Sequence, residues 1–132
     1  MNLETPKFTI NKSQKELFTY LTKADNYVNI MPDGVEKFEV LTENSFLFQL
    51  KGMPVIQLAF KEKNEFDNII LEAGGGKFPF SLTADFNPVD DNQTEFQMKF
   101  EGEFNAMMAM MIKSPINKFI NALTTNFNKL MS

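Results

Sequence analysis

Residues 93–131 read QTEFQMKFEGEFNAMMAMMIKSPINKFINALTTNFNKLM, and the spacing of apolar residues changes once within this stretch. From Phe96 to Phe104, apolar and polar residues alternate, which predicts a strand with one buried face. After Asn105, apolar residues recur every three or four positions, which predicts a helix. Because a sheet needs a second layer to cover its apolar face, the stretch predicts an antiparallel sheet closed by a C-terminal helix.

The pair Ser114-Pro115 lies inside the helical pattern. Proline at the first helical position after a serine cap is a typical helix start. We therefore expect a break or kink there, with residues 105–113 as a separate or bent turn. The main helix is expected from Pro115 to Met131, long enough to cross a sheet.

The alternation of apolar and polar residues also extends upstream to Val35 and is interrupted by short polar or glycine-containing turns. It predicts six consecutive antiparallel strands. Before them, residues 6–11 predict a first strand. Ser13 and Glu16 form a capping box that starts a helix, and Asp25 is expected to cap a short second helix. The expected fold is α+β, in the order β-α-α-β6-α.

The composition narrows the chemistry that the chain can perform. The 132 residues fit one domain, and 15 phenylalanines with 43% hydrophobic residues indicate a packed core. There is no Cys, His or Trp, and every basic residue is Lys, so no cofactor or metal is expected and the usual His- and Cys-dependent nucleophiles are excluded. A net charge of −4 argues against nucleic acid as a partner.

The chain also lacks the patterns of export and of membrane insertion. No basic segment followed by an apolar one begins the sequence, and no apolar run approaches the roughly 20 residues of a membrane span. We therefore expect a cytoplasmic protein.

Three stretches carry a resemblance to a known superfamily. They are Phe8-Thr9-Ile10-Asn11-Lys12-Ser13 with Glu16-Leu17-Phe18 and Asp25-Asn26-Tyr27, the hairpins of residues 35–104, and the segment from Asn105 to Pro115. Together they resemble the START/Bet v 1-like (SRPBCC) superfamily, among whose smaller members are polyketide cyclase-like and carbon monoxide dehydrogenase subunit-like proteins. The resemblance covers essentially residues 1–132. It implies a helix-grip fold, in which a curved seven-stranded sheet wraps around a long C-terminal helix and leaves an apolar cavity between them.

The resemblance also implies where a ligand binds. It places the opening of the cavity at residues 31–34, 52–54 and 74–77 and at the start of the last helix. We expect the inner sheet face to consist of Phe46, Phe48, Leu58, Phe60, Phe80, Phe96 and Met98. Met108, Met111 and Ile112 are expected to face them across the cavity, with Tyr27, Met31, Met53 and Asn105 near the opening.

The expected function is binding, extending to transport, of a small hydrophobic molecule such as a lipid, an isoprenoid or an aromatic polyketide. No catalytic residue is assigned, because the inward positions are almost all Phe, Leu, Ile and Met. An alternative is a cyclase or dehydratase, which needs an inward carboxylate or phenol with a shifted pKa. Another is an interaction module in which the Met-rich segment 107–111 contacts a protein partner or a second copy of the chain.

Overall fold

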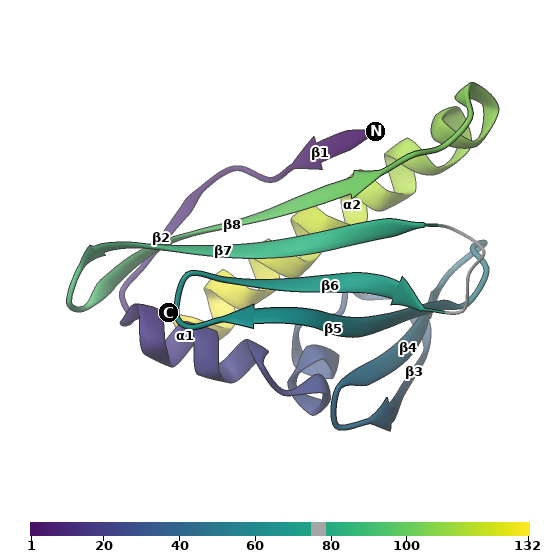
Figure 1. Ribbon diagram of the computed structural model, residues 1–132. Coiled ribbons are helices and arrows are strands. Elements are labelled where there is room, and N and C mark those ends of the chain that lie inside the picture. Colours follow the sequence, from purple (N-terminus) through teal and green to yellow (C-terminus); the bar gives the residue numbers. More distant parts are fainter. Residues whose placement is uncertain (75–78) are drawn as a thin grey trace.

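A computed structural model describes residues 1–74 and 79–132 and contains one antiparallel sheet with helices against it (Figure 1). The elements follow in the order β1 (Asn2–Glu4), β2 (Phe8–Ile10), α1 (Gln14–Leu21), the 3-10 helix η1 (Ala24–Ile30), β3 (Val35–Thr42), β4 (Ser45–Leu50), β5 (Ile56–Asn64), β6 (Asn68–Gly74), β7 (Phe80–Asp90), β8 (Gln93–Gly102) and α2 (Ala106–Met131). The sheet order is β1-β8-β7-β6-β5-β4-β3, with β2 also paired to β8. This arrangement confirms the α+β helix-grip fold.

The strand predicted over residues 6–11 corresponds to β2, and an additional short strand that was not predicted, β1, precedes it; the two pair with successive parts of β8. The division falls at Thr5 and Pro6, and a proline has no backbone N–H to offer a neighbouring strand. Thr5 keeps the connection in place, since its hydroxyl accepts a hydrogen bond from the Met98 amide at 3.0 Å. The sheet therefore has eight strand segments where seven strands were predicted.

The start of α1 confirms Ser13 as the predicted cap, although the Glu16 carboxylate of the predicted capping box bonds to the Ser13 hydroxyl and not to a backbone amide. The Glu16 amide donates to the Ser13 hydroxyl at 3.1 Å, and that hydroxyl donates to the Glu16 carboxylate at 3.2 Å. The predicted cap of the second helix was wrong, because η1 begins after Lys23 without a side-chain cap and Asp25 lies within its first turn.

Helix α2 is continuous, so the predicted break before Pro115 was wrong. The helix begins nine residues earlier, where the Asn105 side chain caps it by accepting from the Met108 amide at 2.8 Å. Pro115 lies inside the helix and lacks the N–H that would bond to the Met111 carbonyl. With 26 residues, α2 is about 39 Å long, and its first turns extend beyond the ends of the strands in Figure 1.

The C-terminal half of α2 packs on the inner face of the sheet and closes the core. Phe119 stacks on Phe48 of β4 with ring centroids 4.7 Å apart, and Phe127 meets Phe96 of β8 at 4.7 Å. The buried residues of the helix all lie from residue 116 onward, namely Ile116, Phe119, Ile120, Leu123, Thr124 and Phe127. The N-terminal turns are left with much of their surface exposed.

Candidate functional site

Most of the predicted inner sheet face belongs to the packed core. The fully buried members are Phe46, Phe48, Leu58, Phe96 and Met98. Phe60 and Phe80 are partly buried and pack against the same core. The structure thus brings these residues together on one face as predicted, while their contact with a ligand stays a prediction.

Tyr27 lies in the core and not at an opening. Its side chain is buried, and its ring stacks on Phe46 with centroids 4.8 Å apart. Its hydroxyl donates to the Leu21 carbonyl at 2.8 Å, a bond that joins η1 to the end of α1. Burial raises the pKa of the Tyr27 phenol above its ordinary value. The expected position of Tyr27 near the opening was wrong, because the aromatic ring is held among other rings.

Asn105 uses its side-chain oxygen to cap α2, so this oxygen is already engaged in stabilising the helix. Its predicted part in orienting a ligand remains a prediction.

The methionines at the start of α2 face different directions. Counting about 100° per residue around a helix, Met108 and Ile112 lie within about 20° of buried Phe119. Both are partly exposed, and Ile112 packs against the core. Met111 lies about 80° from Phe119 and is 67% exposed. The expectation that Met111 faces the inner sheet was therefore wrong.

Met107 and Met110 are still more exposed than Met111, at 73% and 83%. They lie about 120° and 180° around the helix from Phe119, so exposure rises with angular distance from the core. The outward side of the first turns of α2 consequently presents three methionines, Met107, Met110 and Met111, which we call the Met face.

A groove of about 450 Å³ opens where two of the predicted loops meet α2, and we call it the mouth groove. Its lining residues are Pro32, Asp33, Gly34, Leu50, Lys51, Met53, Ser114, Pro115, Lys118, Phe119 and Ala122. Two of the three predicted loops, residues 31–34 and 52–54, contribute to it. The third, residues 74–77, lies outside the described residues except for Gly74, which ends β6.

Backbone geometry and one side chain position the loops of the mouth groove. Gly34 and Gly52 have φ of 85° and 78°, a backbone conformation that is unfavourable for residues other than glycine. Asn126 of α2 donates to the carbonyls of Ile30 and Met31 at 3.0 and 3.2 Å, which ties the loop after η1 to the helix. Met31 is itself buried beside the groove, and Met53 lines it.

Sequence reasoning missed Leu50, Lys118, Phe119 and Ala122 as groove residues. It expected Met108, Met111 and Ile112 to form the helix side of the cavity, and so put the groove wall too early in the chain. The apolar stripe that includes Phe119 was the signal that could have found this wall, because the stripe marks the side of α2 that faces the sheet.

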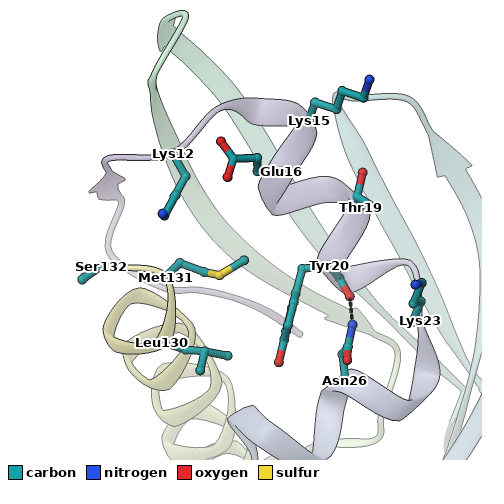
Figure 2. A pocket seen from close by; sticks show the side chains of 10 residues that line it. All are labelled: Lys12, Lys15, Glu16, Thr19, Tyr20, Lys23, Asn26, Leu130, Met131 and Ser132. Atoms are coloured by element: carbon teal, nitrogen blue, oxygen red, sulfur yellow. Dashed lines mark hydrogen bonds between the residues drawn. The ribbon is translucent and has the colours of Figure 1, made fainter.

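A second groove lies between α1 and the last turn of α2, and we call it the lysine groove (Figure 2). Its volume is about 570 Å³, and its lining residues are Lys12, Lys15, Glu16, Thr19, Tyr20, Lys23, Asn26, Leu130, Met131 and Ser132. Lys12 extends toward the end of α2, whereas Lys15 points away from it (Figure 2). A helix carries partial negative charge at its C-terminal end, so nearby lysines stabilise this end of α2.

The described core contains few groups that could perform chemistry. Among residues 1–74 and 79–132, the buried polar side chains apart from Tyr27 are Thr5, Thr94, Gln97 and Thr124. The enzymatic alternative needs an interior carboxylate or phenol, and Tyr27 is the described side chain of that kind. Its hydroxyl already donates a hydrogen bond to the Leu21 carbonyl.

The described part of the chain shows neither a metal-ligand cluster nor a helix suited to cross a membrane. No three acidic side chains there come together as metal ligands. No helix within the same ranges has the length and apolar character needed to cross a bilayer.

The curved sheet and the long helix that packs on it define a helix-grip fold, with the mouth groove where the two meet. No protein-family model matches the sequence, and no curated protein matches it. The similarity of this chain to known proteins is therefore found in the structure and not in the sequence.

Solved structures with this fold cover nearly the whole chain. A START superfamily protein from Mycobacterium smegmatis is 11% identical with a TM-score of 0.71, over 98% of this chain and 96% of that one. Norcoclaurine synthase from Thalictrum flavum, in complex with dopamine and hydroxybenzaldehyde, is 10% identical with a TM-score of 0.73, over 98% and 86%. A conserved protein from Geobacillus kaustophilus is 14% identical with a TM-score of 0.69, over 99% and 95%. At these identities the similarity shows the fold alone.

Proposed function

We propose that residues 1–132 form one START/Bet v 1-like domain that binds a small hydrophobic molecule in the mouth groove. The observation that carries the proposal is the groove itself, whose 450 Å³ lies within the roughly 300–1,000 Å³ of ordinary ligand sites. A lipid, an isoprenoid or an aromatic polyketide would suit it, and transport of such a molecule within the cytoplasm is the proposed role.

The apolar part of the groove supplies the binding energy in this proposal. Leu50, Met53 and Phe119 line it, and Phe119 also stacks on Phe48 in the core. A ligand that covers these side chains removes apolar surface from water, at about 25 cal/mol per Å² before association costs. Methionine adapts its shape, so Met53 suits ligands of varied outline.

The fold gives this proposal independent support. Norcoclaurine synthase, which shares the fold at a TM-score of 0.73, was crystallised with dopamine and hydroxybenzaldehyde. A helix-grip domain of this kind therefore accommodates small aromatic molecules in that protein.

The test is binding of a neutral apolar dye, Nile red, followed by its fluorescence. Ala122→Phe places a ring inside the mouth groove and should weaken dye binding about tenfold or more. Asn117→Phe is the matched control, because Asn117 is exposed on the side of α2 away from Phe119. Ser114→Phe, at an exposed position of the same groove, serves if Ala122→Phe does not fold. The proposal would be contradicted if the parent protein did not raise the fluorescence of the dye. It would also be contradicted if the groove variants bound the dye as tightly as the parent does.

The Met face supports a second candidate, self-association through α2. Three exposed methionines on one side of a helix are an unusual use of apolar surface, and methionine suits adaptable contacts. Light scattering over a range of concentrations should then report a dimer that Met110→Ser disrupts. A monomer at all concentrations would remove this candidate.

A further inference from the structure

The mouth groove carries more positive charge than the chain as a whole. Lys51 and Lys118 line it together with one acid, Asp33, whereas the protein has a net charge of −4. The two ion pairs within the described residues are Lys7–Glu95 and Lys99–Asp85, which lie elsewhere. Lys51 and Lys118 therefore have no acidic partner among the described residues.

The two lysines stand beside an apolar surface. Leu50 ends β4 directly before Lys51, and Phe119 directly follows Lys118 in α2, so each lysine borders an apolar groove residue. A lysine stem is flexible and apolar, and it places its ammonium at the boundary between apolar surface and water. The groove thus offers an apolar surface with two cations at its edge.

We propose that the ligand is an amphipathic anion, with an apolar body on Leu50, Met53 and Phe119 and an anionic head group between Lys51 and Lys118. This inference rests on the proposed function, and it further specifies that the ligand carries a negative charge. The lysine groove fits such a ligand less well. Each groove has one acid in its lining, Glu16 in the lysine groove and Asp33 in the mouth groove. In the lysine groove, however, the C-terminal end of α2 also repels an anion and competes with it for the nearby lysines.

The experiment compares decanoate with decan-1-ol, which share an apolar chain and differ in charge at neutral pH. Calorimetric titrations below the micelle concentration should show decanoate binding about tenfold more tightly than the alcohol, since each exposed ion pair contributes a factor of up to about five. The double variant Lys51→Gln/Lys118→Gln should lose this preference and keep its affinity for the alcohol. Raising the salt concentration should reduce the preference in the parent only.

Lys12→Gln is the matched control, since Lys12 extends into the lysine groove. It should keep the parent's preference for decanoate. Equal binding of acid and alcohol by the parent would overturn the inference and leave the proposed function standing. Preference that survives in the double variant, or that disappears in Lys12→Gln, would also overturn it. Failure of both probes to bind would instead contradict the proposed function.

Discussion

Tyr27→Phe tests the role of the buried phenol, because it removes one oxygen and leaves the ring. The substitution deletes the 2.8 Å hydrogen bond to the Leu21 carbonyl and preserves the stack on Phe46. A net contribution of about 1 kcal/mol for the bond, plus the cost of a poorly satisfied buried carbonyl, gives an expected loss of roughly 1–2 kcal/mol at pH 7.

The same substitution changes how stability depends on pH. Burial raises the pKa of Tyr27 in the folded protein, while the unfolded chain keeps the ordinary value near 10. The stabilisation due to the neutral phenol is therefore complete below about pH 10 and is lost as the pH rises above it, by about 1.4 kcal/mol per unit. The variant lacks this phenol, so its disadvantage should shrink to about zero near pH 11.

The assay is urea unfolding of both proteins, followed by circular dichroism at pH 7, 9 and 11. The lysines are common to both proteins and cancel in the difference. In a Tyr20→Phe background, where Tyr27 is the one remaining phenol, tyrosinate absorbance should rise only as the protein unfolds. A stability difference that is the same at pH 7 and pH 11 would refute the argument, as would ionisation of Tyr27 in the folded protein.

Substitutions at three further positions test the helix and the groove by the same unfolding measurement. Pro115→Ala should stabilise the protein by about 1–3 kcal/mol, because alanine restores the missing helical bond; no gain would mean that the helix is interrupted there. Asn105→Ala should cost about 1 kcal/mol through loss of the cap, and Asn105→Asp should retain most of the stability if capping is the reason. Gly52→Ala should cost about 1 kcal/mol, because φ of 78° strains any side chain; an unchanged midpoint would contradict this.

Much of the fold could be predicted because the inner face of the sheet is apolar over much of β4, β6, β7 and β8. The alternation in residues 80–86 and 96–100 corresponds to β7 and β8, where Phe86 pairs with Phe96 in register. The cap at Ser13 was equally readable, since the Glu16 amide that it binds lies within one turn. Local signals sufficed where the local preference and the tertiary packing agree.

The start of α2 could not be predicted locally, because Asn105 and Ser114 are both favourable caps. The choice between them depends on whether a helix tolerates Pro115. The groove residues were also beyond sequence reasoning, because Lys51 and Lys118 are brought together only by the packing of α2 on the sheet. The direction of Met111 was also wrong, because the predicted break separated residues 105–113 from the main helix. In the continuous helix, the direction of Met111 is fixed by the residues that pack on the sheet.

The position of Pro115 explains how one helix can serve both the core and the groove. The carbonyl that loses its partner belongs to Met111, whose turn is largely exposed, so water can satisfy that carbonyl. Directly after Pro115 the helix begins to pack on the sheet, with Ile116 and Phe119 buried. A proline in that buried turn would leave a carbonyl without water, at a much higher cost. Pro115 therefore lies where the helix is still open to water, and there it borders the mouth groove beside Lys118 and Phe119.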